Sequence, residues 1–311
     1  MSPATDGLLE PAVADVREAA PAAAQAPRPF YWSVRRELWE NRSVYLGPLG
    51  VATFGVVALV IHAITMPSHM PGMLANDPAT VGTAGIAYRV AAILMLVTAF
   101  VVGTFYTLDA LSSERRDRSI LFWKSLPVSD LTTVLAKATI PLVVLPLVTF
   151  AALAAMHLVL LLLSSFALLV QGQSAAPLWG EVQLFRMWLA LLYALVAITL
   201  WMAPVYAFLL LVSGWAKRTA ALWAVLPLLA LGLLEKLTMD TTRVAAMVQY
   251  WLIGWYTRAF AIKAPEHVPF DPATALTPGR LLGTPSLWIG LALAAVFIAA
   301  AVRLRRYREP I

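Results

Sequence analysis

Residues that could perform catalysis or bind a metal are few and far apart in this chain of 311 residues. It has no cysteine, which excludes disulfides, thiol catalysis and cysteine-based metal sites. No two of the four histidines, at positions 62, 69, 157 and 267, share a predicted helix at metal-ligand spacing. The sequence also lacks a G-x-x-x-x-G-K-[ST] phosphate loop, an H-E-x-x-H helix and a G-x-S-x-G turn. We therefore expect no catalytic residue, no metal and no cofactor in this chain.

Three polar residues lie within or beside long apolar stretches. His157 lies inside one of them, where it could serve a transport pathway or a proton relay. The alternative is a neutral imidazole that bonds to a neighbouring helix. Glu235 and Lys236 end another stretch, and we interpret them as a boundary pair whose charged groups reach toward water. No carboxylate lies deep within an apolar stretch, which disfavours ion-coupled transport.

The densest group of charged and aromatic residues is SSERRDRSILFWKSLPVSDLTTVLAK, residues 112–137, between two apolar stretches. A short helix is predicted before Pro127, and Ser129 can cap the helix that follows. Phe122 and Trp123 need a place to be buried, either in the headgroup layer or in a protein partner. Charges of both signs beside them are suited to fixing the register of a partner. The combination favours a protein partner.

Composition places the chain among polytopic membrane proteins with an all-α fold. Hydrophobic residues make up 60% of it and charged residues 13%, whereas a soluble domain has about 25% charged residues. Several apolar stretches approach or exceed the roughly 20 helical residues that cross the hydrocarbon of a bilayer. The predicted spans are 44–66, 88–108, 134–163, 184–212, 219–235 and 286–302. Pro141 and Pro146 predict a kink in the third span, or a start within the headgroup layer.

The distribution of Lys and Arg predicts the orientation. Basic clusters precede the first span and occur in the 109–137 loop, in the 213–218 turn and at the C-terminus. Six spans place all of these on one side, which the positive-inside rule assigns to the cytoplasm, with both termini. The net charge of +6 therefore indicates orientation in a membrane, and we expect no nucleic-acid partner. Residues 1–29, rich in Ala and Pro, are predicted to be a disordered cytoplasmic tail.

The segment VAAMVQYWLIGWYTRAF, residues 244–260, competes for the place of a seventh span. It carries Gln249 in its middle and Arg258 near its end, and a central charge costs about 2.5 to 3.5 kcal/mol on insertion. Its Trp and Tyr residues favour the interface. A seventh span would also put the basic C-terminus outside. We therefore predict an interfacial or re-entrant helix on the outer side.

The segment FYWSVRRELWENR, residues 30–42, precedes the first span. Most of its apolar residues share one helical face, with Arg35, Arg36, Glu37 and Glu40 elsewhere. This pattern predicts an amphipathic helix that lies along the inner membrane surface. A cytoplasmic extension of the first span is the alternative.

In the order of these features the chain resembles the membrane (permease) subunit of type 2 ABC exporters, over residues 30 to about 308. In that family an amphipathic helix precedes six spans, and short re-entrant helices lie outside between the last two spans. The loop between spans two and three carries an E-R pattern, seen here as Glu114-Arg115 followed by RSILFWKSLPVSD. The long 236–285 loop and the N-terminal tail are departures from the pattern.

The resemblance implies a permease that forms a translocation pathway as a dimer, with itself or a paralogue, in a bacterial cytoplasmic (inner) membrane. ATP and Mg would be bound by a separate ABC ATPase subunit, contacted by a coupling helix. The implied coupling residues are Glu114, Arg115, Arg116, Arg118, Phe122, Trp123, Lys124, Leu126 and Pro127. An outer gate is predicted from Tyr250, Trp251, Trp255 and Tyr256. A belt that only sets depth is the alternative for these four. For the whole chain, the alternatives are a non-transporting scaffold or sensor subunit and an intramembrane enzyme.

Six spans with both ends inside can be tested because the chain has no cysteine of its own. A Tyr307→Cys variant should react with an impermeant maleimide only after the cells are permeabilised. Phe270→Cys, in the predicted outer loop, is the control and should react in intact cells. Reaction at position 307 from outside would refute six spans.

Overall fold

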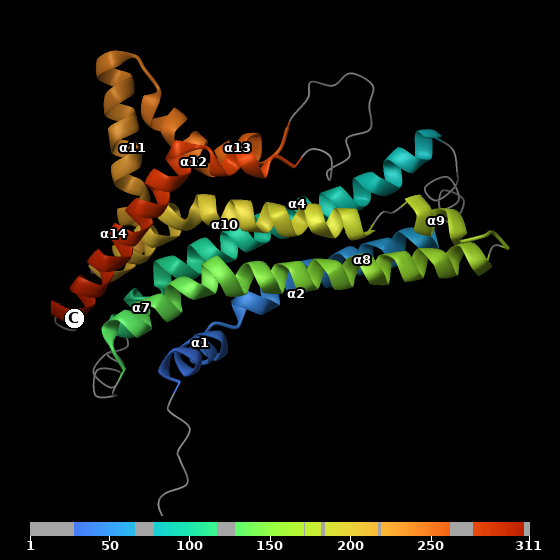
Figure 1. Cartoon of the computed structure of the whole chain (residues 1–311), viewed down its shortest axis with the longest axis horizontal. Coiled ribbons are helices and arrows are strands. Elements are labelled where there is room, and N and C mark those ends of the chain that lie inside the picture. The colour runs from blue at the N-terminus through green and yellow to red at the C-terminus, as the bar shows by residue number, and fades with distance from the viewer. Residues whose placement is uncertain are drawn as a thin grey trace, which may run out of the picture.

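A computed structural model gives the architecture, and it describes residues 28–65, 78–116, 128–170, 172–181, 184–216, 219–261 and 276–307. Within these ranges the fold is all-α, without strands (Figure 1). The elements are α1 (Pro29–Glu40), α2 (Ser43–Thr65), α4 (Pro78–Asp109), α5 (Ser112–Arg116), α7 (Asp130–Thr139), η2 (Ile140–Val144), α8 (Leu145–Val170), α9 (Ala176–Glu181), α10 (Leu184–Trp215), α11 (Ala220–Met239), α12 (Arg243–Ala259), α13 (Pro278–Leu282) and α14 (Pro285–Tyr307).

Five helical stretches of the described residues are long and apolar enough to cross a membrane: Val90–Arg116, Asp130–Val170, Leu184–Trp215, Ala220–Met239 and Pro285–Tyr307. These coincide with the second to sixth predicted spans, so the chain is an all-α membrane protein. The first predicted span coincides with α2. Its apolar part Ser43–Ala58 is shorter than the five stretches named above. Six spans therefore stay a prediction. The tail that we predicted at 1–29 falls almost wholly outside the described residues.

The third span contains a local break at the prolines. Between α7 and α8 the turn η2 is π-helical, and the amide of Leu145 donates to the carbonyl of Ile140, five residues back. Pro141 has no amide hydrogen and would clash with the carbonyl four residues earlier in an α-helix. Pro146, which follows the turn, imposes the same restriction. The wider turn accommodates both prolines within one continuous helical stretch of 41 residues.

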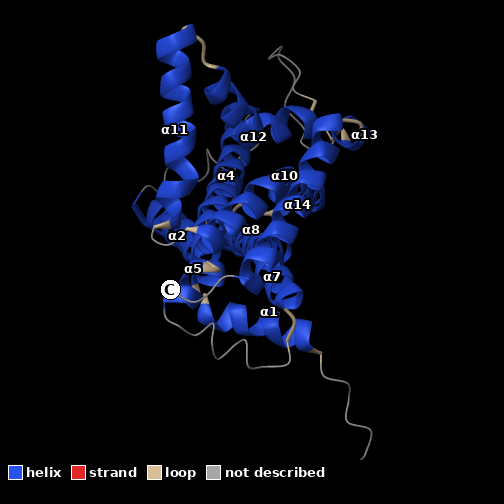
Figure 2. Ribbon diagram, turned by 90° about the vertical axis from the view of Figure 1, so that its left-hand side faces the viewer, coloured by secondary structure: helices blue, strands red, loops and turns tan. Residues whose placement is uncertain are grey.

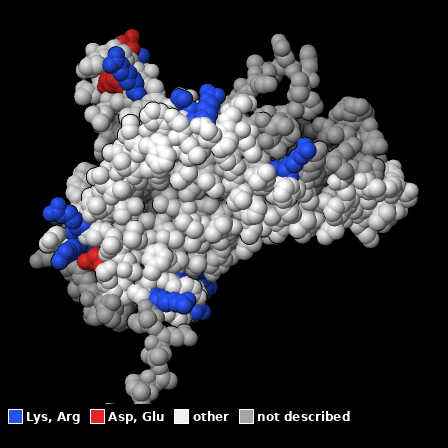
Figure 3. Space-filling model, in the orientation of Figure 1, with Lys and Arg blue, Asp and Glu red and all other residues white. Residues whose placement is uncertain are grey.

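Helix α10 lies in the middle of the bundle and packs against α4, α8, α12 and α14. Its fully buried Trp201 and Met202 belong to the largest apolar core. Helix α2 packs on α4 and α8. The outward faces of these helices carry exposed Leu, Val, Ile and Phe side chains, as expected for surfaces that face lipid. In the space-filling view the middle of the bundle is almost free of charge (Figure 3).

Helix α11 leaves the end of α10 and stands away from the rest of the bundle (Figures 1 and 2). Only Ala220 and Ala224 of its residues are buried. Its far end turns back into α12 through an αL residue, Asp240. The side chain of Glu235 accepts hydrogen bonds from the amides of Arg243 and Val244, at 2.6 and 2.8 Å. Glu235 therefore caps the first turn of α12, a role that our interpretation as a boundary pair missed.

Helix α12, the predicted outer helix, packs against α10 and the first turns of α14. The indole nitrogen of Trp201 donates to the carbonyl of Trp251 at 3.1 Å, and the two rings lie 5.7 Å apart. The hydroxyls of Tyr250 and Ser286 share a hydrogen bond. This packing requires Gly290, because a Cβ there would lie 2.8 Å from the ring of Trp251. Tyr250 and Trp251 thus pack α12 against α10 and α14.

Gly290→Ala should weaken the contact between α12 and α14, because the added methyl group overpacks the Trp251 ring. Overpacking typically costs about 1 to 3 kcal/mol, which would be measured as a lower unfolding temperature in detergent. Gly50→Ala is the matched control, since a Cβ at Gly50 meets nothing within 4 Å. If both variants unfold at the wild-type temperature, the predicted contact is not tight.

Candidate functional site

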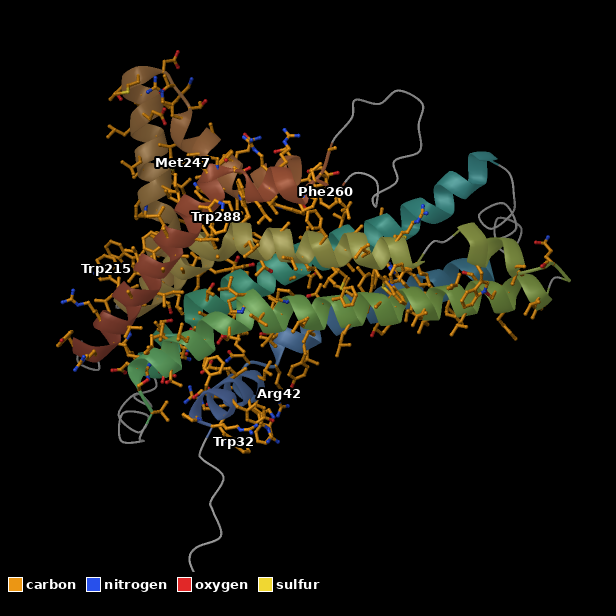
Figure 4. All side chains as sticks on the ribbon, in the orientation of Figure 1. Trp32, Arg42, Trp215, Met247, Phe260 and Trp288 are labelled. Carbon is orange, nitrogen blue, oxygen red and sulfur yellow. The ribbon has the colours of Figure 1, made fainter. Side chains whose placement is uncertain are left out.

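One end of the bundle holds a cluster of charged side chains that face each other inside the protein. Here α1, α5, α7 and the last turns of α14 come together, and Figure 4 shows α1 below the ends of α7 and α14. We call this cluster the ionic network. Its members are Arg36, Glu37, Glu114, Asp130, Lys137 and Arg305.

Lys137 of α7 lies at the centre of the ionic network with 2% of its surface exposed. Its Nζ lies 2.9 Å from Oε1 of Glu37 and 3.1 Å from Oε1 of Glu114. Tyr106 of α4 donates its hydroxyl to the second carboxylate oxygen of Glu37 at 2.9 Å. A single amine therefore joins the amphipathic helix α1, the segment after α4 and the start of the third span.

Glu114 is the second centre of the ionic network. Its Oε1 accepts from Arg36 at 3.2 Å as well as from Lys137, and its Oε2 pairs with Arg305 of α14. Arg305 also donates through Nε to Asp130, the first residue of α7, at 3.1 Å. Glu114 thus connects the beginning of the 112–137 stretch to three other elements of the chain.

The charges of the ionic network balance, three acidic against three basic groups. The balance is required because an uncompensated ion away from water costs several kcal/mol. The environment of Arg36 illustrates it. Burial is the largest single effect and disfavours its charged form, but the hydrogen bond and charge of Glu37, together with the charges of Glu40 and Glu114, outweigh it, so the pKa of Arg36 is raised. At the rim, partial burial is the largest effect on Glu40 and raises the pKa of this carboxyl despite its contact with Arg36.

Arg115, next to Glu114, fastens the same segment to α10. Its Nη2 donates to the carbonyls of Ser213 and Ala216, at 2.6 and 2.7 Å. The hydroxyl of Ser213 accepts from the amides of Leu111 and Ser112. The positive group satisfies carbonyls at the C-terminal end of α10, where the helix dipole favours a cation. Segments about 100 residues apart are held together by these bonds.

The structure places the predicted coupling residues in two groups. Of the residues that we expected at an interface with an ATPase, Glu114 and Arg115 are buried within the chain and Arg116 is exposed. Arg118, Phe122, Trp123, Lys124, Leu126 and Pro127 lie outside the described residues. Contact with an ATPase stays a prediction for all of them. Beyond this segment, Ser129 caps α7 as predicted, accepting from the amide of Thr132.

The predicted outer-gate residues and His157 lie far from the ionic network. Tyr250 and Trp251 pack on Trp201, while Trp255 and Tyr256 pack around Phe260, which Figure 4 labels beside α13. His157 is buried in α8, with 2% of its surface exposed. A gating role for the four aromatic residues and a pathway role for His157 stay predictions.

Sequence reasoning missed Glu37, Lys137 and Arg305 as members of one site. We predicted that Arg36 and Glu37 lie off the apolar face of α1, but both are turned into the protein, where Val34 and Leu38 also pack. The available signal was a lone lysine in the apolar run VLAKATIPLVV. A charged residue in such a run needs a partner of opposite charge, although the sequence of the run does not identify that residue.

The ionic network holds elements together and shows no catalytic arrangement. Among the described residues, no group of His, Asp and Glu is placed to hold a metal ion. The fold and the ionic network together define an all-α membrane protein whose segments are joined by buried charges at one end. Comparison with family models, curated proteins and solved structures found no match to this chain.

Lys137→Met should destabilise the protein strongly, because it leaves Glu37 and Glu114 with unbalanced charge. Breaking a buried pair costs about 3 to 5 kcal/mol, to be measured by thermal or denaturant unfolding in detergent. Lys236→Met is the matched control, since the Lys236–Asp240 pair is exposed and worth at most about 1 kcal/mol. Adding Glu37→Gln to Lys137→Met should recover part of the loss. Equal stability of the two lysine variants would contradict the role of the network.

Proposed function

We propose that this chain is the membrane-spanning permease subunit of an ATP-driven exporter of the type 2 ABC family. Two permeases, identical or paralogous, form the translocation pathway, and separate ATPase subunits bind ATP and Mg²⁺. The end with the ionic network faces the cytoplasm of a bacterial inner membrane, with both chain termini on that side. The chain itself has no catalytic role.

The observation that carries this proposal is the position of Glu114 in the ionic network. The resemblance assigns ATPase contact to the stretch that begins there. A rigid connection from that stretch to α1, α7 and α14 is what transmission of a movement into the spans requires, since buried ion pairs resist separation. A loop that served only to link two spans would not need charges from three other elements.

The packing of α12 supports the same proposal. Helix α12 follows the apolar helix α11 and precedes the apolar helix α14; it packs on α10 and contacts α14 through Tyr250 and Trp251. The family is expected to have its outer helices at this position in the chain. Because Trp251 and Tyr250 join α12 to these helices, a change in the angle between α10 and α14 would move α12. A pathway opened from the ATPase side would thereby affect its outer end.

The test is co-purification of an ATPase subunit with the Phe122→Ala/Trp123→Ala variant at matched expression. Truncation of buried aromatic anchors at an interface commonly costs 2 kcal/mol or more, roughly a thirtyfold loss of affinity. Trp255→Ala is the control, because it alters an aromatic side chain of α12, outside the 112–137 stretch, and should retain wild-type binding. Transport in vesicles with the purified complex is measured in parallel.

Two results would contradict the proposal. If the complex forms at wild-type strength and transport is normal in the double variant, the 112–137 stretch is not the coupling element. If no ATPase accompanies even the wild-type chain from its native membrane, a non-transporting scaffold or sensor subunit is favoured instead.

A further inference from the structure

A groove opens between α10, α11 and α14, at the end of the bundle that carries the ionic network. Its volume is about 920 Å³ and its walls are mainly apolar. Phe208 and Leu211 of α10, Pro227 of α11 and Ala300 of α14 form much of the wall. The groove exists because α11 diverges from the bundle, which leaves a wedge between it and α14 (Figure 1).

Two indoles packed edge to face line the groove. The rings of Trp215, at the end of α10, and Trp223, near the start of α11, lie 5.0 Å apart with an edge-on geometry. Figure 4 labels Trp215 beside α14. Tyr307, the last residue of α14, lines the same groove. Trp and Tyr at the ends of spans mark the depth of the headgroup layer, while Phe208 and Pro227 lie a turn or more further from the ends.

Arg303 is the charged residue in the lining of the groove. It is exposed and has no ion pair with any described residue, in contrast to Arg305 two positions later, which is buried in the ionic network. A guanidinium at the headgroup depth beside an apolar wall matches a molecule with a phosphate at one end and hydrocarbon at the other.

We propose that this groove binds one anionic phospholipid from the membrane leaflet at the ionic-network end. The phosphate pairs with Arg303 between the aromatic side chains, and an acyl chain lies along Phe208, Leu211 and Ala300. A free phosphate ion would leave the apolar wall uncovered, so the lipid is the occupant that satisfies both the charge and the hydrocarbon surface. The site is independent of the proposed export function.

The test is native mass spectrometry of the protein released from detergent after incubation with equal amounts of phosphatidylglycerol and phosphatidylcholine. Wild type should retain phosphatidylglycerol in preference to phosphatidylcholine. Arg303→Gln should reduce that retention about fivefold, since one cation near a membrane surface is worth about that factor. Arg306→Gln removes the same charge from an exposed neighbour that does not line the groove and should behave as wild type.

A second pair of variants tests the apolar wall. Ala300→Trp fills the groove and should abolish preferential retention, whereas Ala299→Trp, exposed and outside the lining, should not. Equal retention by Arg303→Gln and Arg306→Gln, or a wild type without preference for phosphatidylglycerol, would overturn the proposal. If Ala300→Trp instead dissociates a dimer and leaves lipid retention unchanged, a second copy of the chain occupies the groove and the proposal is wrong.

Discussion

The cost of an unpaired charge away from water governs how this chain is assembled. Lys137 lies in the third span with almost no access to solvent, so it has to meet carboxylates, and those carboxylates need further cations. Glu37, Glu114 and Arg305 satisfy this requirement from three separate elements. The register of α1, α5, α7 and α14 relative to one another is therefore defined by charge, whereas apolar contacts between membrane helices would permit sliding.

Two regions of the bundle are held by different interactions. At one end, the buried charges join α1, α5, α7 and α14, and the Arg115 bonds add α10 as a fifth element. Halfway along α10, Trp201, Trp251 and the close approach at Gly290 hold α12 by aromatic packing, and Glu235 caps its first turn. Between them the helices present apolar surfaces to lipid. The buried charges and the aromatic contact thus fix different helices of the same bundle, α1, α7 and α14 in one case and α12 in the other.

Much of the fold could be predicted from the sequence, because a bilayer sets the length and polarity of a span. The predicted stretches 184–212 and 286–302 differ from α10 and α14 by a few residues at their ends. The site could be predicted only in part. Glu114 was identified from its local stretch, but its partners Lys137 and Arg305 lie 23 and 191 positions away and are brought to it by packing. For Glu37, helical periodicity identifies a polar face without showing whether water or protein covers it.

The π-helical turn at Ile140–Val144 also rotates the side-chain directions of α7 relative to those of α8, the two halves of the third span. Each residue of an α-helix advances the side-chain direction by about 100°, so the extra residue in this turn rotates α7 by about that much relative to α8. With this rotation, Lys137 points into the charges while Leu145 and Leu153 point into apolar core. The extra residue of the π-helical turn thus lets one long helix place Lys137 among charges and Leu145 and Leu153 in apolar core.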